Sequence, residues 1–260
     1  MILGTKPTRT PQAIVMKTDS SHARTAYESW HFELGVDKES NAPWHQLLKR
    51  YLNPERDLAG RHIFEIGCGR GGFSCWLARQ TPRPAAIVAA DFSNTAVRKA
   101  DAFARAEDLP GLHWLVGDIE CLPHPTGSFD LVVSCETIEH VPDPQRALGE
   151  LARVLRPGGR LYLTCPNYFS PVGLHRIYLW CCRRHFSEEG QPINQFLLLP
   201  RTRAWVKRAG LRVLTVDAAG FYLPFPGRPL VEVPWLGSPR WLMRWLGHHA
   251  LIIAEKPRAI

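Results

Sequence analysis

The chain has 260 residues, of which 45% are hydrophobic, and its formal net charge is +8. This length fits one large domain, and no apolar run reaches the about eighteen residues that a membrane span needs. The N-terminal stretch lacks the continuous apolar segment of a secretory signal. The seven cysteines, an odd number, favour reduced thiols over a disulfide framework. We therefore expect a cytoplasmic protein.

The excess of basic residues is concentrated between Tyr168 and Arg212, where eight Lys/Arg face two Asp/Glu. A basic surface can bind nucleic acid, a membrane surface or an acidic substrate, or it can be a solvated face. No zinc-finger, helix-turn-helix or RNA-binding signature accompanies it, which argues against nucleic acid. We expect a small-molecule acceptor as the partner and keep peripheral membrane contact open. The sequence does not decide the oligomeric state.

The predicted elements begin with a helix over residues 42–52, whose apolar residues share one face. Strands are then expected at 61–66, 85–90, 112–116, 129–134 and 160–164. Helices are expected between them: one starting in a glycine cluster after residue 66, one over 93–105 and one over 144–155. This alternation predicts a parallel sheet covered by helices on both faces, with ligands bound beyond the carboxyl ends of the strands.

The segment 168–199 breaks this alternation and carries an apolar stretch flanked by arginines. Such a stretch can be a plain helix with core-facing aromatics, or it can lie at a membrane surface. After it, a helix (201–209), a strand (211–217), a helix near 239–246 and a strand (250–255) complete the chain.

Three glycines, Gly67, Gly69 and Gly71, follow the first predicted strand and open a helix. Positions without a side chain let the backbone approach a ligand closely, and the N–H groups at a helix start favour an anion. Gly67, Gly69 and Gly72 also satisfy the dinucleotide fingerprint, so a nicotinamide or flavin enzyme stays open. Asp91 ends the second strand and can accept hydrogen bonds from ribose hydroxyls, or it can simply cap a helix.

Later motifs separate these alternatives. They are Gly117-Asp118-Ile119-Glu120 after the third strand, Glu136-x-x-x-His140 after the fourth, and Arg156-Pro157-Gly158-Gly159 before the fifth. Together with the glycine loop and Asp91, this ordered set over residues 61–167 resembles the class I S-adenosylmethionine-dependent methyltransferases. The resemblance is to the subgroup that includes ubiquinone/menaquinone-pathway and natural-product methyltransferases.

The resemblance implies an α/β fold: a Rossmann-like, doubly wound, seven-stranded sheet that is mostly parallel with an antiparallel last strand. It also implies an N-terminal arm and a lid insertion after strand five. We expect a single domain over residues 1–260. Its predicted parts are an N-terminal arm and helix (1–55), the cofactor-binding core (61–167), a substrate lid (168–199) and the C-terminal part of the core (200–260).

The resemblance also implies S-adenosyl-L-methionine as the cofactor and assigns roles by position. The glycine loop faces the methionine end, Asp91 holds the ribose and Asp118 the adenine amino group. Asp118 can also be a loop-stabilising acid. The predicted cofactor residues are Glu65 (where Asp is commoner in the family), Gly67, Cys68, Gly69, Gly71, Asp91, Phe92, Asp118, Ile119, Ser134 and Cys135.

His140 is the candidate catalytic residue, because an acceptor hydroxyl has to lose its proton and a histidine can take it. The alternative is that His140 orders its loop. The predicted substrate-binding residues are Tyr27, Trp30, His31, Glu136, Tyr168 and Arg176. No metal site is expected, because Cys181, Cys182 and His185 lack a second ligand pair.

The sequence therefore predicts methyl transfer to a small or medium organic acceptor, with a quinone, a natural product or a sugar methylated at oxygen as the preferred case. Alternatives are an N- or C-methyltransferase, an NAD-dependent oxidoreductase, or a non-catalytic methyltransferase-like partner protein.

Overall fold

A computed structural model of the chain describes residues 20–182, 193–223, 231–233 and 243–258. Its helices are α1 (Ser20–Glu33), α2 (Pro43–Lys49), α3 (Pro54–Asp57), α4 (Gly72–Ala78), α5 (Asn94–Ala106), the 3-10 turn η1 (Ile138–His140), α6 (Pro144–Val154), α7 (Pro171–Cys181) and α8 (Leu199–Arg208). Its strands are β1 (His62–Ile66), β2 (Ala86–Asp91), β3 (Leu112–Val116), β4 (Phe129–Cys135), β5 (Leu155–Pro166), β6 (Arg212–Ala219), β7 (Tyr222–Leu223), β8 (Val231–Glu232) and β9 (His249–Glu255).

Seven of the described strands form one sheet in the order β3-β2-β1-β4-β5-β9-β6, and β7 pairs with β8 separately. The first five strands of this order are parallel, whereas β9 runs antiparallel to both β5 and β6. The predicted seven-stranded, mostly parallel sheet is confirmed, and its antiparallel strand lies between β5 and β6. Within the described part of the chain, no helix is both long and apolar enough to cross a bilayer.

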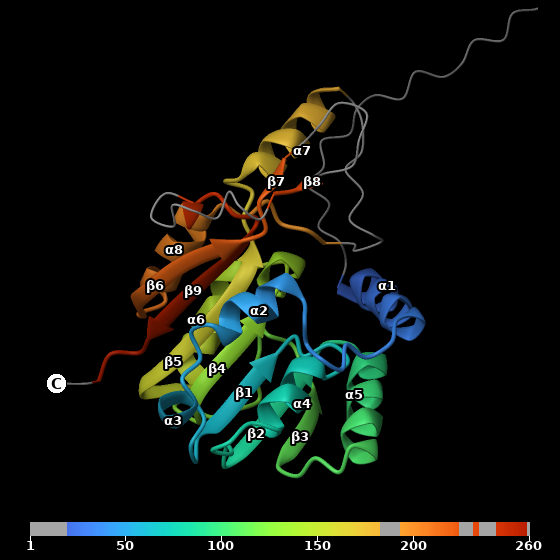
Figure 1. Ribbon diagram of the computed structural model, residues 1–260, viewed down its shortest axis with the longest axis vertical. Helices are drawn as coiled ribbons and strands as arrows, with labels where there is room; N and C mark the ends of the chain where they lie inside the picture. The colour runs from blue at the N-terminus through green and yellow to red at the C-terminus, as the bar shows by residue number, and fades with distance from the viewer. Residues whose placement is uncertain (1–19, 183–192, 224–230, 234–242, 259–260) are drawn as a thin grey trace, which may run out of the picture.

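Helices cover the sheet on both faces (Figure 1). Alternate strand residues point to opposite faces: Ile63 packs with residues of α2 and α4, whereas Phe64 packs with residues of α6 and α8. The central strands β1, β4, β5 and β9 are buried almost throughout, whereas the edge strands β3 and β6 are partly exposed, so the middle of the sheet is the buried layer of the domain.

The strand register brings four carboxyl ends to one edge of the sheet. Ile66 of β1 pairs with Ala90 of β2 and Ser134 of β4, and Asp91 pairs with Val116 of β3. The loops that follow these strands therefore meet in space. Helix α1 packs against α5 near this edge, and α7 projects away from the sheet (Figure 1).

Two parts of the chain differ from the sequence prediction. Strand β5 begins at Leu155, five residues before the predicted start, and its pairing with β4 jumps from Phe129↔Leu155 to Leu131↔Arg160. The residues Arg156-Pro157-Gly158-Gly159 thus form an irregularity within the strand. In the predicted lid, α7 is described, but residues 183–192 lie outside the described residues, as do residues 1–19 of the arm and 239–242 of the predicted late helix.

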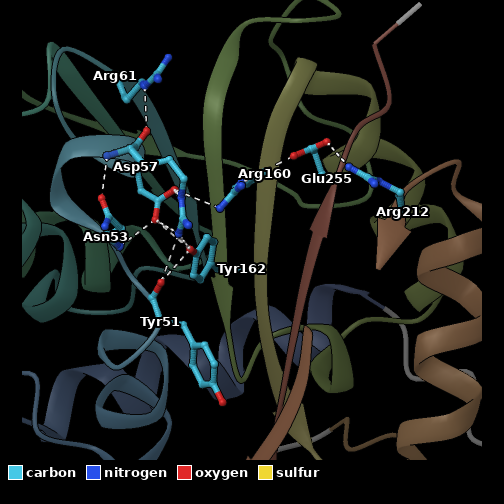
Figure 2. A network of polar contacts seen from close by, with 9 residues as sticks. Tyr51, Asn53, Asp57, Arg61, Arg160, Tyr162, Arg212 and Glu255 are labelled. Atoms are coloured by element: carbon cyan, nitrogen blue, oxygen red, sulfur yellow. Dashed lines mark hydrogen bonds and ion pairs between the residues drawn. The ribbon is translucent and has the colours of Figure 1, made fainter. Parts of the chain in front are cut away.

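A polar network joins α3 to the sheet (Figure 2). The Tyr162 hydroxyl donates to Asp57 Oδ2 over 2.9 Å and receives a hydrogen bond from Arg56 at the same distance. Asp57 is only 4% exposed, and Arg56 and the Asn53 N–H bind its carboxylate. Arg160 extends the network at 3.8 Å from Asp57 Oδ1. These contacts satisfy a buried carboxylate that would otherwise be costly.

Candidate functional site

A cavity of about 610 Å³ lies at the carboxyl edge of the sheet. This volume is in the range that binds small molecules and cofactors. Its walls come from the loops after β1, β2, β3 and β4, from α1 and from the segment around α2. Among the described residues of the predicted lid, Ile193 contributes to the wall.

The glycines of the loop after β1 are required for different structural reasons. A Cβ at Gly71 would lie 2.6 Å from Ala100 Cβ and 2.7 Å from the Trp114 ring, and Gly71 has a φ of 81°. A Cβ at Gly69 would meet only His31 Cε1, at 3.7 Å. Gly71 is therefore required by packing against α5 and β3, and Gly69 is the position that faces open cavity space.

Asp91 organises this loop. Its Oδ2 accepts a hydrogen bond from the Gly69 N–H (2.8 Å), and its Oδ1 accepts one from the Ser93 N–H (2.9 Å). Burial raises the pKa of Asp91 despite these two hydrogen bonds. Each carboxylate oxygen has a second lone pair, and the residue lines the cavity. Asp91 can therefore accept hydrogen bonds from ligand hydroxyls.

Glu65 is the second buried acid of the site. It is 2% exposed, lines the cavity and accepts a hydrogen bond from the Ser74 hydroxyl. Burial raises its pKa to about 7, and the nearby Asp91 acts in the same direction. A cationic ligand group beside Glu65 would favour its ionised form.

The loop after β3 forms the third wall. Asp118 Oδ1 accepts a hydrogen bond from the Glu120 N–H at 2.8 Å, which fixes the loop. Asp118 and the 4% exposed Ile119 line the cavity together. The arrangement offers one acceptor group beside an apolar surface, as a heteroaromatic ring with an amino group would need.

Helix α1 covers the glycine loop. Arg70 donates from Nη1 to His31 Nδ1 over 3.1 Å, so the proton of the His31 ring is on Nε2, which lies 3.9 Å from Asp91 Oδ1. Burial lowers the pKa of His31 to about 4, which keeps the ring neutral. The Arg70 guanidinium lies 5.4 Å from the Trp30 ring. Trp30 and His31 both line the cavity.

His140 lies on η1 opposite α1. Its Nδ1 is 2.8 Å from the Ile193 carbonyl oxygen, and because a carbonyl only accepts, Nδ1 carries the proton. Nε2 is then the basic nitrogen, with Glu139 Oε1 at 3.5 Å to stabilise the ring once it is protonated. The Tyr27 ring lies 5.8 Å away, and the Tyr27 hydroxyl donates to the same Ile193 carbonyl.

Most predicted site residues line this one cavity: Tyr27, Trp30, His31, Glu65, Gly67, Cys68, Gly69, Asp91, Phe92, Asp118, Ile119, Cys135, Glu136 and His140. Four others lie elsewhere. Gly71 packs against α5, and Ser134 is fully buried on the strand next to Cys135, whose side chain takes the opposite face. Tyr168 stacks on Phe196 at 4.6 Å with the Arg176 guanidinium 4.7 Å from its ring, so both residues belong to a contact outside the cavity.

The sequence prediction did not name several cavity residues. Trp44 and His45 of α2 and Arg70 line the wall. In the sequence, Trp44 falls on the apolar face of a predicted helix, and this position favours a role in core packing. No spacing in the chain indicates that α2 reaches a loop after β4, because that approach is set by tertiary folding.

Comparison with known proteins finds relatives of the core. Residues 64–163 match the family described as "Methyltransferase domain". A ubiquinone biosynthesis O-methyltransferase of Coxiella burnetii is 26% identical over 179 residues, which are 66% of this chain and 73% of that protein. A phthiotriol/phenolphthiotriol dimycocerosates methyltransferase of Mycobacterium ulcerans is 38% identical over 149 residues, 54% of this chain and 53% of that protein.

Solved structures with a similar fold include a methyltransferase. The crystal structure of a SAM-dependent methyltransferase from Aquifex aeolicus aligns with a TM-score of 0.59 at 16% identity. The alignment covers 88% of this chain and 97% of that one. At this identity the likeness shows a shared fold, and the function has to be argued from the site.

Proposed function

We propose that this enzyme transfers a methyl group from S-adenosylmethionine to a hydroxyl oxygen of an organic acceptor, because residues 64–163 match a methyltransferase domain and the sheet has the strand order of the expected fold. The single observation that carries the proposal is the convergence of Asp91, Asp118 and the Gly67–Gly69 loop on one cavity with His140. The preferred acceptors are a quinone precursor, another natural product or a sugar. The O-methyltransferase named among the relatives supports oxygen as the methylated atom.

The cavity fits the cofactor in size and chemistry. Asp91 would hold the ribose hydroxyls, Asp118 the adenine amino group, and Gly69 leaves room for the methionine end. Glu65, buried beside this loop, is suited to face a cationic amino group. When bound, the cofactor supplies an electrophilic methyl group, so the protein has to contribute alignment and removal of the acceptor proton.

His140 is proposed to take that proton. The Ile193 carbonyl fixes the Nδ1–H tautomer, which leaves Nε2 to accept a proton from a hydroxyl in the cavity. Glu139, 2% exposed, stabilises the resulting imidazolium from 3.5 Å. The aromatic residues Tyr27, Trp30 and Trp44 line the same space.

The test is turnover of a panel of phenols, hydroxy acids and sugars, read as formation of S-adenosylhomocysteine. For any acceptor found, His140→Gln should lower kcat by about 100-fold or more and leave the affinity for S-adenosylhomocysteine within about twofold. Equal turnover by wild type and His140→Gln would exclude His140 as the base.

A further inference from the structure

Glu136 has an unusual position in the cavity wall. Its φ is 45°, in the left-handed region that residues with a side chain seldom adopt. The Glu136 N–H donates to the Thr164 carbonyl (3.1 Å) and to Thr164 Oγ1 (3.2 Å), which holds this conformation in place. Strained backbone of this kind persists where the surrounding structure enforces it, commonly at a ligand site.

The carboxylate of Glu136 is only half satisfied. Oε2 lies 3.4 Å from His249 Nδ1, whereas Oε1 is buried and has no hydrogen-bond partner among the described residues. A buried carboxylate oxygen without a partner is costly, and such an atom in a native protein calls for an explanation. Glu136 lines the cavity, so a turn of its carboxylate about the terminal torsion can present an oxygen to a donor group of a ligand.

The surroundings of Glu136 in the cavity wall are mostly aromatic. The Trp44 ring lies 5.2 Å from the His249 ring, and His45 stacks on Phe73 at 4.9 Å. Trp44, His45 and Phe73 all line the cavity. These residues come from α2 and α4. A ring or other apolar group can pack there while a polar group reaches Glu136.

We propose that Glu136 is an acceptor-binding residue whose Oε1 accepts a hydrogen bond from a hydroxyl or amino group of the methyl acceptor, and that His249 positions its carboxylate. The inference rests on the proposed function. The acceptor class is then an organic molecule that carries a hydrogen-bond donor next to a ring or apolar group, in addition to the hydroxyl beside His140.

The experiment compares two probes by NMR titration, with and without saturating S-adenosylhomocysteine. Benzylamine carries a donor beside a ring, and benzyl methyl ether has the ring without a donor. Wild type should prefer benzylamine by about tenfold, the value of one charge-assisted hydrogen bond, and Glu136→Gln should reduce this preference to about twofold. His249→Gln, which can still donate, should keep more of the preference than His249→Phe.

Glu120→Gln is the matched control, because it removes the same charge from the same cavity but from a carboxylate bound by the Asp143 N–H. It should leave the preference for benzylamine unchanged.

A preference for benzylamine that survives in Glu136→Gln would overturn the proposal and leave Glu136 with a structural role. The titration without S-adenosylhomocysteine separates this result from the proposed function: failure of wild type to bind S-adenosylhomocysteine would count against the cofactor site, and the probe preference would still be measured.

Discussion

Glu28 of α1 accepts a hydrogen bond over 2.8 Å from the hydroxyl of Ser93, the N-cap residue of α5. The same carboxylate accepts from the N–H groups of Asn94 and Thr95 at 2.8 and 2.9 Å. Negative charge is favourable at a helix N-terminus. These contacts fasten α1 to the core and thereby hold Tyr27, Trp30 and His31 against the cavity.

Glu28→Gln is expected to loosen α1. Desolvation disfavours the ionised form of Glu28, but the hydrogen bonds from Thr95, Ser93 and Asn94 lower its pKa to about 2. Because the folded-state pKa is below the ordinary 4.5, the stabilisation is present above that value and is lost as the pH falls towards 2. Hydrogen exchange across residues 25–33 should rise in the variant at pH 7. The exposed Glu33→Gln on the same helix is the control, and equal exchange in both variants would refute the fastening role.

Gly71→Ala and Gly69→Ala should separate packing from ligand binding. Both positions have positive φ, so each alanine carries about 1 kcal/mol of backbone strain. Gly71→Ala adds the collisions with Ala100 and Trp114 and should destabilise the protein by about 3 kcal/mol or more in denaturant unfolding. Gly69→Ala should fold but bind S-adenosylhomocysteine more weakly. Similar stability of the two variants would contradict this division.

Glu65 should make stability depend on pH. Burial raises its pKa to about 7, above the ordinary 4.5, so the folded state holds the proton that the unfolded state releases. Its contribution is therefore present at low pH and is lost as the pH rises from 4.5 through 7. The difference in unfolding free energy between wild type and Glu65→Gln should fall over this range, by on the order of 3 kcal/mol at most. Burial lowers the pKa values of His31 and His45 to about 4, which makes stability rise with pH. This contribution is the same in wild type and variant, so it cancels in the difference. A flat difference would be incompatible with a protonated Glu65.

The Tyr162 hydroxyl should matter for stability and not for the cavity. Tyr162→Phe leaves the buried Asp57 with one hydrogen bond fewer and should cost about 1 to 2 kcal/mol in denaturant unfolding. Arg212→Ala, which removes a 66% exposed side chain at the other end of the network in Figure 2, should cost about 0.5 kcal/mol or less. Equal losses of unfolding free energy in the two variants would show that the buried Tyr162 hydroxyl contributes no more to stability than the exposed Arg212 side chain.

The sheet and the residues that line the cavity at the carboxyl ends of its strands could be predicted from the sequence because both are local. The alternating apolar strands set the layers, and the residues directly after each strand, such as Asp91 and Asp118, reach one edge by register. The acceptor side could not be predicted, because α2 and the loop after β4 meet only in the tertiary structure. Tyr168 and Arg176 were expected at the substrate on the basis of chain position, and stacking on Phe196 holds them outside the cavity.

The proposed cofactor site is tested most directly by calorimetric titration of wild type and Asp91→Ala with S-adenosylhomocysteine. Saturable binding to wild type, weakened at least about tenfold (about 1.4 kcal/mol) by the substitution, is the predicted result. Asp91→Asn, which keeps one oxygen acceptor, should lie between the two. Absence of binding to folded wild type, or equal affinity in Asp91→Ala, would contradict the assignment of this cavity to the methyl donor.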